Sequence, residues 1–342
     1  MFRTKSGLRK IAAIISITAA LSITAPAAAQ AAALAGKNDF ATDRFMRNKF
    51  SSTGSLASFS GDYGIALEMI LQRSAAGETL AQLGTPVSYL LTRTNVIGNV
   101  STRTGYLFNT DSTKTLKPGL AGKFIFTSQA VNAPTEDGLQ WSIFKELSKS
   151  VSTNGTVSGA TNDLDYAWVL MASSAYGWNS QGNRVAQRMV ALQNADGGFS
   201  SYGSASSVDA TALALQALVL NRWVGTDAQD TTRTAAINKA YLYIQRHDSQ
   251  NNRINYSDGN FDVNSTGYAA MAMDALADGM RAGTNKNRVT TLRNAYASEL
   301  AKRVSETGGF EVYWAVGAGD VMATSQAYAG MLLKSYNQLL ND

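Results

Sequence analysis

The chain has 342 residues with 30 Lys and Arg, 25 Asp and Glu, one His and no Cys, and its net charge is +5. The absence of cysteine excludes disulfides, thiol nucleophiles, thioester chemistry and cysteine-ligated metals. Four of the cations lie in the first ten residues, so the rest of the chain carries a charge of about +1. This balance gives no basic surface for nucleic acid.

The first segment, residues 1–29, is predicted to be a signal peptide. A cationic start is followed by an apolar stretch from Ile11 to Ile23 and by Pro26 with three alanines. This pattern is typical of a cleaved secretory signal, with cleavage expected after Ala29. The apolar stretch is shorter than the ~20 residues that span a bilayer. We therefore expect a secreted or extracytoplasmic protein without stable membrane insertion.

Residues 30–50 are expected to be a flexible N-terminal segment of the mature protein, and residues 51–342 a single all-α domain. The domain is rich in alanine and leucine and has no proline after Pro134. None of its apolar segments shows the strict alternation of a half-buried strand. Residues 96–136 are too irregular for their structure to be predicted.

The second half of the domain contains an internal repeat. Each unit has a helix, a loop with an aromatic residue after small or polar residues, a polar cap and a second helix of small residues. Three threonines that open these second helices, Thr211, Thr266 and Thr324, are 55 and 58 residues apart. This period predicts helix pairs. With weaker copies upstream, starting near Asp62, Gly119 and Asp165, we expect five or six pairs that close into an α/α toroid.

The run from Gln193 to Phe199, Gln-Asn-Ala-Asp-Gly-Gly-Phe, followed by Val208 to Ala212, resembles the repeat motif of squalene and hopene cyclases. Protein prenyltransferases have a similar repeat, so the motif is of the prenyltransferase-like or terpenoid cyclase-like kind. The resemblance covers residues 185–335 well. It implies an α/α toroid with a central cavity, and it implies no particular reaction.

The cyclase resemblance also indicates which catalytic residues to look for. Class II terpene cyclases use an Asp-x-Asp-Asp motif whose middle carboxyl is the acid, and Asp209 is the only carboxylate left at that motif, between Ser207 and Ala210. Asp209 is therefore the single catalytic candidate, and its alternative role is to cap a helix. The zinc site of protein prenyltransferases needs a cysteine and is excluded. No metal or cofactor is expected.

Three other kinds of chemistry remain open. His247 could serve a hydrolase, although its place at a predicted helix end suggests a structural role. An oxygen-rich loop over residues 248–262 could hold calcium, but its residues are also those that favour turns. Glycan-active α/α barrels use paired carboxylates beside aromatic residues. The candidates for such pairing are Glu68, Asp165, Asp262, Glu311 and Asp320, with Trp168, Trp178, Tyr313 and Trp314 as stacking surfaces.

Equivalent loops of the repeats should lie at one mouth of the toroid, because repeat-equivalent segments share a face. Their aromatic residues could form the rim of a ligand site or could plug the barrel. The predicted ligand-binding residues are Phe199, Tyr202, Asp209, Tyr256, Phe310, Tyr313 and Trp314. The leading hypothesis is a non-catalytic binding or interaction protein whose ligand is a small molecule, lipid, glycan or protein. The alternatives are a degenerate terpene cyclase-like enzyme and a glycan-active hydrolase or lyase.

Overall fold

The structure is a computed structural model that describes residues 40–133, 138–221, 227–249, 252–280 and 283–340. The predicted signal peptide and residues 30–39 lie outside the described residues. Residues 40–50 differ from the expected flexible segment, because residues 40–47 form a helix. Met46 of this helix is fully buried, so apolar packing fixes the segment to the domain.

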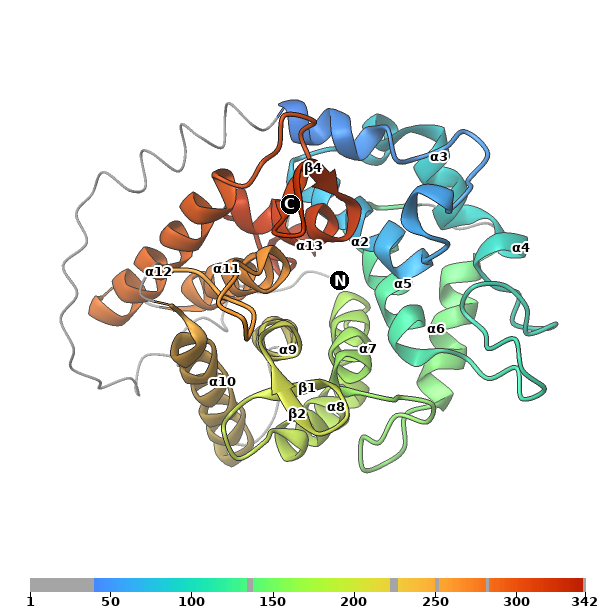
Figure 1. Ribbon diagram of the computed structural model, residues 1–342. Coiled ribbons are helices and arrows are strands. Elements are labelled where there is room, and N and C mark those ends of the chain that lie inside the picture. Colours follow the sequence, from blue (N-terminus) through green and yellow to red (C-terminus); the bar gives the residue numbers. More distant parts are fainter. Residues whose placement is uncertain (1–39, 134–137, 222–226, 250–251, 281–282, 341–342) are drawn as a thin grey trace.

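Six helices of the described chain form an inner ring (Figure 1). Each contacts the next in chain order, and the last contacts the first, so the ring is closed. In order they are α2 (Tyr63–Ala75), α5 (Pro118–Ala130), α7 (Asp163–Ala175), α9 (Val208–Leu220), α11 (Val263–Gly279) and α13 (Val321–Met331).

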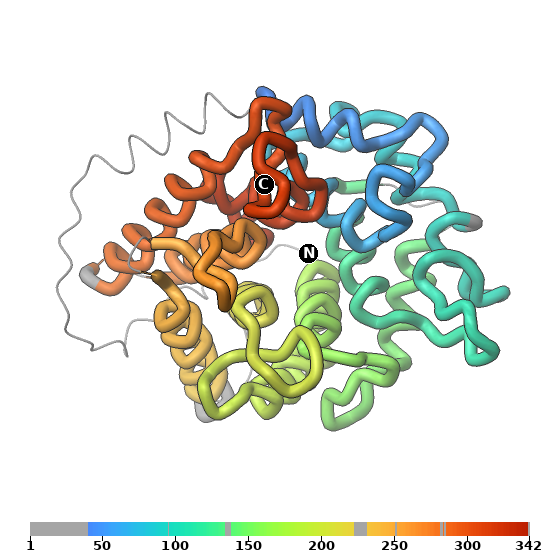
Figure 2. The backbone as a smooth tube through the Cα atoms, in the orientation of Figure 1, coloured from blue at the N-terminus to red at the C-terminus, as the bar shows by residue number. Residues whose placement is uncertain are grey.

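An outer ring surrounds the inner one, and inner and outer helices alternate along the chain (Figures 1 and 2). The outer helices are residues 40–47, α3 (Leu80–Thr92), α6 (Leu139–Lys149), α8 (Asn179–Leu192), α10 (Asp227–His247) and α12 (Thr284–Ala301). Short helical turns are η1 (Ala57–Phe59), α4 (Thr94–Ile97) and η3 (Gln338–Leu340). This architecture confirms the predicted α/α toroid, with six helix pairs.

Small residues allow the inner helices to pack closely. A Cβ added at Gly267 of α11 would lie 2.4 Å from the Cα of Ala327 in α13, and one at Gly122 of α5 would lie 2.7 Å from the carbonyl oxygen of Trp168 in α7. Both distances are far below van der Waals contact. Glycine is therefore required where these inner helices cross.

The three predicted repeats share one hydrogen-bonding pattern. In each, the threonine hydroxyl near the start of the inner helix donates to a carbonyl oxygen four residues earlier, at 2.6 to 2.7 Å. The same hydroxyl accepts from a backbone N–H in the preceding loop. These loop contacts join Thr211 to Phe199 at 2.9 Å, Thr266 to Ile254 at 3.0 Å and Thr324 to Phe310 at 2.9 Å. The repeat read from the sequence is therefore a repeat of tertiary contacts.

Two short antiparallel hairpins precede inner helices and add a feature that the sequence patterns did not indicate. Strand β1 (Phe199–Tyr202) pairs with β2 (Ala205–Ser207) before α9, and β3 (Phe310–Val312) pairs with β4 (Ala315–Asp320) before α13. Because outer and inner helices alternate, the inner helices all start at the same end of the ring. The hairpins therefore lie at one mouth of the toroid, as expected for repeat-equivalent loops.

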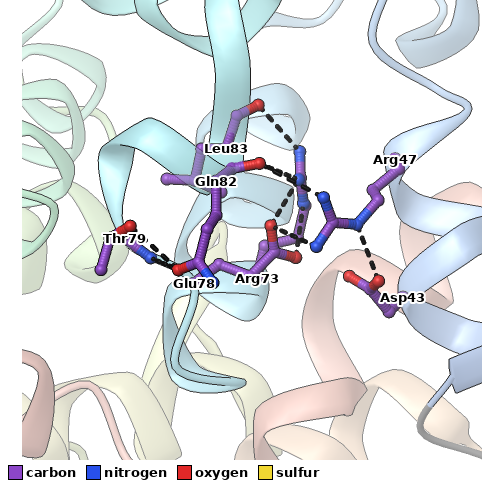
Figure 3. Close-up of polar contacts among 7 residues, drawn as sticks. All are labelled: Asp43, Arg47, Arg73, Glu78, Thr79, Gln82 and Leu83. Atoms are coloured by element: carbon purple, nitrogen blue, oxygen red, sulfur yellow. Dashed lines mark hydrogen bonds and ion pairs between the residues drawn. The ribbon is translucent and has the colours of Figure 1, made fainter.

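An ion cluster fastens the helix of residues 40–47 to the turn between α2 and α3 (Figure 3). The guanidinium of Arg73, 2% exposed, donates to both carboxylate oxygens of Glu78 at 3.0 and 2.6 Å. Arg47 reaches the same Glu78 at 3.0 Å and also pairs with Asp43 at 2.7 Å. The cluster links the first outer helix to the start of the ring.

The C-terminal segment closes the other end of the ring. Tyr336 is fully buried, its ring lies 6.2 Å from that of Phe126 and 5.7 Å from that of Trp168, and its hydroxyl accepts from the side chain of Gln72 at 3.1 Å. Its backbone N–H donates to Gln216 at 3.2 Å. Four inner helices thus contact this one residue, which forms the floor of the toroid. No helix in the described ranges is long and apolar enough to cross a membrane.

Candidate functional site

The interior of the ring contains one layer of side chains at equivalent helix positions. The sixth residue after the N-cap of each inner helix belongs to this layer, because equal positions in parallel helices lie at one level. We call it the axial layer, and it consists of Glu68, Lys123, Trp168, Leu213, Tyr268 and Gln326. All are buried except Lys123, whose side chain is 14% exposed.

Glu68 is the centre of the axial layer. One oxygen of its carboxylate accepts from Lys123 at 2.9 Å and from the hydroxyl of Tyr268 at 2.5 Å, and the other accepts from Gln326 at 3.0 Å. The ammonium of Lys123 also lies 5.0 Å from the centre of the Trp168 ring. A buried charge with this many partners is structural, since each contact offsets its loss of hydration.

The predicted central cavity does not extend through the level of the axial layer. The buried side chains of the axial layer fill the ring there, so the part of the interior open to a ligand lies above them, at the mouth. Asp209 of α9 is four residues before Leu213, one helical turn of about 6 Å nearer the mouth. Residues four apart share a helix face, so Asp209 also points inward.

Asp209 does not cap its helix, contrary to the alternative role considered for it. The cap of α9 is Ser207, whose hydroxyl accepts from the amide of Ala210. A carboxyl oxygen of Asp209 instead lies 2.6 Å from the hydroxyl oxygen of Ser265 in α11. The same hydroxyl lies 2.8 Å from a carboxylate oxygen of Asp262, the cap of α11. Two carboxyl groups thus meet across one serine.

The surroundings of Asp209 favour its neutral form. Burial, together with the charges of Asp262 and Glu68 and against the opposing hydrogen bond from Ser265, raises the pKa of Asp209 to about 7. Burial also raises the pKa of Asp262, but the backbone amide and hydroxyl of Ser265 and the hydroxyl of Tyr256 oppose this by bonding to its charged form. Asp209 is therefore the carboxyl of the pair that holds a proton near neutral pH.

Tyr256 connects this carboxyl pair to a cluster of aromatic rings at the mouth. Its ring lies 5.4 Å from that of Tyr313 and 5.9 Å from that of Trp314, which are themselves 4.8 Å apart in an edge-to-face arrangement. Tyr313 is 44% exposed and Trp314 is 62% exposed. We call these three residues the aromatic triad. The triad and the carboxyl pair form one continuous site.

The other predicted ligand-binding residues are not part of this site. Phe199 and Phe310 are fully buried, because each begins a hairpin strand whose backbone is held by a repeat threonine. Their assignment to a ligand site is corrected here, since their rings belong to the core. Tyr202, at the end of β1, is 91% exposed, and it stays a prediction on a hairpin different from that of the aromatic triad.

The remaining carboxylate candidates serve local structure. Asp320 caps α13 by accepting from Ala323 at 2.7 Å, and Asp165 accepts from the amide and the hydroxyl of Thr161. Glu311 lies in the middle of strand β3. Trp168 belongs to the axial layer, and Trp178 packs in the outer ring against Phe144, with ring centres 4.3 Å apart.

His247 and the oxygen-rich loop also have local roles in the structure. A ring nitrogen of His247 lies 2.9 Å from the carbonyl oxygen of Tyr243, one turn earlier in α10, as expected for a helix end. Asp258 accepts from the amide of Asn260 in a tight turn. No group of three His, Asp or Glu residues suited to a metal occurs within the described ranges. Asn251 of the loop lies outside them.

The sequence offers Asp262 as one of five carboxylate candidates, but it does not pair Asp262 with Asp209 and does not point to Ser265. A usable signal existed, because the repeat alignment places Asp262 at the cap position that Ser207 occupies in α9.

A surface groove of about 610 Å³ lies elsewhere, between the helix of residues 40–47 and the hairpin of β3 and β4. None of its lining residues belongs to the carboxyl pair or the aromatic triad.

Comparison with known proteins supports the fold. No family model matches the chain, and no curated protein matches it. Among solved structures, an unsaturated glucuronyl hydrolase from Bacillus sp. GL1, responsible for the degradation of glycosaminoglycan, is similar with a TM-score of 0.57. The identity is 11%, over 90% of this chain and 96% of that chain.

Two further solved structures have the same architecture. The type II terpene cyclase MstE from Scytonema matches with a TM-score of 0.60 at 11% identity, over 93% of this chain and 100% of that chain. An unsaturated glucuronyl hydrolase from Streptococcus agalactiae matches with a TM-score of 0.54 at 10% identity, over 90% of both chains. At these identities the similarity shows the shared toroid and no more.

Proposed function

We propose that the protein is a glycan-active enzyme in which Asp209 is the general acid. The observation that carries the proposal is the pairing of Asp209 with Asp262 through Ser265, at the mouth of the toroid and beside an exposed aromatic triad. Among the α/α toroids similar to this chain are hydrolases that act on glycans. The proposal favours one of the alternatives from the sequence over the non-catalytic binding protein.

The pKa of about 7 suits Asp209 to acid catalysis at neutral pH. A general acid must hold its proton until the oxygen of the reacting bond needs it, and its ideal pKa is near the working pH. Enzymes that cleave glycosidic bonds use a pair of carboxyl groups of this kind. In this assignment Asp209 protonates the sugar-linked oxygen, and Asp262 is the carboxyl that is charged before this transfer.

The aromatic triad supplies a surface suited to a sugar. The faces of Tyr313 and Trp314 remain partly exposed, and aromatic rings present large apolar surface with little conformational freedom to lose. A sugar ring has an apolar face for stacking and hydroxyls for hydrogen bonds. Tyr256 belongs to the triad and also bonds to Asp262, so stacking would place a sugar beside the acid.

The geometry argues against a terpene cyclase. Protonation of an alkene calls for a stronger acid in an apolar chamber that encloses a long hydrocarbon chain. Here the layer beneath Asp209 includes Glu68, Lys123 and Gln326, and it is packed by its own side chains. A polar substrate bound at a shallow mouth fits this arrangement better.

A non-catalytic role leaves the carboxyl pair unexplained. Placing Asp209 beside Asp262 destabilises the fold, because burial and repulsion both oppose its charge. Asp209 caps no helix that would offset this. Strongly shifted carboxyl groups with a specific partner in a concave region are typical of active sites.

The test is turnover of a panel of oligosaccharides, including uronate-containing and cell-wall glycans, with polyprenyl compounds as a separate arm. We expect Asp209→Asn to lower turnover of an accepted glycan by about 10²- to 10⁴-fold, the usual loss for a general acid. Asp111→Asn, at an exposed loop carboxylate, is the matched control and should leave turnover unchanged. Product masses would identify the bond that is cleaved.

Three outcomes would overturn the proposal. Turnover that survives Asp209→Asn would remove the acid from its role. Cyclisation of a polyprenyl compound would restore the cyclase alternative. Glycan binding, followed by thermal shift, without any turnover would support the non-catalytic binding protein.

A further inference from the structure

Ser265 occupies an unusual place between two carboxyl groups. Its hydroxyl oxygen lies 2.6 Å from an oxygen of Asp209 and 2.8 Å from an oxygen of Asp262. Both are ordinary distances for a hydrogen bond between two oxygens. Each contact therefore needs a proton between the two oxygens that it joins.

The number of protons on Ser265 decides what these contacts mean. A serine hydroxyl carries one proton and can donate only one hydrogen bond at a time, whereas an ionised carboxylate only accepts. If Asp209 and Asp262 were both ionised, one of the two contacts would bring lone pairs together without a proton. One of the carboxyl groups must then carry a proton and donate it to Ser265.

The charged groups around the pair decide which carboxyl prefers that proton. Asp262 caps α11 by accepting from the backbone amide of Ser265 at 3.0 Å and is bonded by Tyr256, so its charge is well stabilised. Within the described residues, Asp209 makes no such contact with a helix amide. The arrangement of lower energy therefore has the proton on Asp209 and the negative charge on Asp262.

Charged groups on the other helices leave this assignment unchanged. Glu68 of α2 and the phenol of Tyr268 in α11 lie within the electrostatic reach of Asp209, and Lys123 of α5 is paired with Glu68. On α7, Asp163 accepts from the amide of Ser200 and Asp165 from Thr161. The net effect of Glu68 on Asp209 is to favour its neutral form.

The geometry points to a proton shared by Asp209 and Asp262 through the hydroxyl of Ser265, which makes Ser265 the positioning residue of the acid. This inference rests on the proposed function and adds the device that keeps the acid loaded. When Asp209 gives its proton to the leaving oxygen as the sugar–oxygen bond breaks, Asp262 takes a proton from the water whose oxygen bonds to the sugar carbon. Ser265 then donates its own proton to Asp209 and receives that of Asp262, so one proton enters, one leaves and the serine is unchanged.

The inference can be tested without substrate, by following the ¹³C resonances of the aspartate side-chain carboxyls through a pH titration. Asp209→Asn and Asp262→Asn assign the two signals. We expect the wild-type pair to titrate in two separated steps, each visible at both carboxyl groups, as coupled sites do. The upper step should fall near neutral pH.

Ser265→Ala is the decisive variant, and Ser265→Thr is the matched control that keeps the hydroxyl. Loss of a bridge that stabilises the singly protonated pair should bring the two steps closer together, so the upper step moves to lower pH. A hydroxyl that only donates to carboxylates lowers their pKa, and its loss would move the upper step to higher pH. That upward movement, or independent titration of the wild-type carboxyls, would overturn the inference.

The activity readout separates this inference from the proposed function. We expect Ser265→Ala to lower kcat. It should also move the high-pH limb of the pH–rate profile, where the general acid loses its proton, to lower pH, whereas Ser265→Thr keeps the wild-type profile. If no glycan is turned over but the coupled titration is present, the proposed function fails and the shared proton stands. If Asp209→Asn abolishes turnover but titration is uncoupled, the reverse holds.

Discussion

At the scale of single residues, the most consequential feature is a carboxyl group placed where its charge is disfavoured. Part of the Asp209 residue is exposed at the ring mouth, but its carboxyl has lost most of its hydration. This loss and the charges of Asp262 and Glu68 all act against its ionised form. The sequence identified Asp209 through its resemblance to a cyclase acid. It could not identify its state, because Ser265 and Asp262 are more than 50 residues away along the chain.

The raised pKa of Asp209 predicts a pH-dependent stability that needs no substrate to measure. Folded Asp209 binds its proton more tightly than the unfolded residue does, so its contribution favours the fold at low pH and is lost as pH rises from about 4 to about 7. Asp209→Asn removes the cost of ionising this buried carboxyl and should stabilise the protein at pH 8 by up to about 4 kcal/mol, with a smaller effect at pH 4.

Urea unfolding of the wild type, Asp209→Asn and the control Asp111→Asn at both pH values checks this prediction. The quantity to compare is the difference in the free energy of unfolding between variant and wild type at each pH. An Asp209→Asn protein that is less stable than the wild type at pH 8 would contradict the prediction, because it would show that the charge is stabilised by the fold.

At the scale of elements, the helix of residues 40–47 shows how position in the structure sets the value of an ion pair. Arg73 and Arg47 both bond to Glu78, but the side chain of Arg73 is 2% exposed and that of Arg47 is 43% exposed (Figure 3). Loss of one partner of a buried pair leaves an uncompensated charge, whereas an exposed pair exchanges its partner for water.

We therefore expect Arg73→Met to lower the free energy of unfolding by about 3 to 5 kcal/mol. Arg47→Met, the matched variant on the same carboxylate, should lower it by less than about 1 kcal/mol. Urea denaturation followed by circular dichroism measures both. Equal losses for the two variants would show that burial of Arg73 does not set the strength of its pairing.

At the scale of the whole molecule, the C-terminal segment links helices that are far apart in the sequence. Tyr336 contacts α2, α5, α7 and α9 and so joins four of the six inner helices of the described ring. A residue that contacts four inner helices stabilises the closed ring that they form. The same residue type on an exposed hairpin does not. Tyr336 and the 91% exposed Tyr202 form such a matched pair.

Tyr336→Ala is expected to lower the free energy of unfolding by about 3 to 5 kcal/mol, because it leaves a cavity at the floor of the ring. Tyr202→Ala should change it by less than about 0.5 kcal/mol. Tyr336→Phe keeps the ring and loses only the contact with Gln72, so its effect should be about 1 kcal/mol. A small loss for Tyr336→Ala, measured by urea unfolding, would contradict the role of the floor.

The sequence by itself determined the all-α toroid, because the threonines at 211, 266 and 324 and the small residues around them mark a local unit that repeats. Periodicity and capping act over a few residues and are readable along the chain. Sequence patterns do not separate buried aromatic residues such as Phe199 and Phe310 from exposed ones such as Trp314. The tertiary structure decided this, since burial depends on what packs against a side chain.

The carboxyl pair was also decided by the tertiary structure alone. Asp209 and Asp262 stand at the starts of adjacent inner helices in different repeats, and only the packing of α9 against α11 brings them to the two sides of Ser265. Hydrogen bonds and carboxyl repulsion act over a few ångströms in space. No spacing along the chain records that distance, so the chemistry of the site follows from the fold.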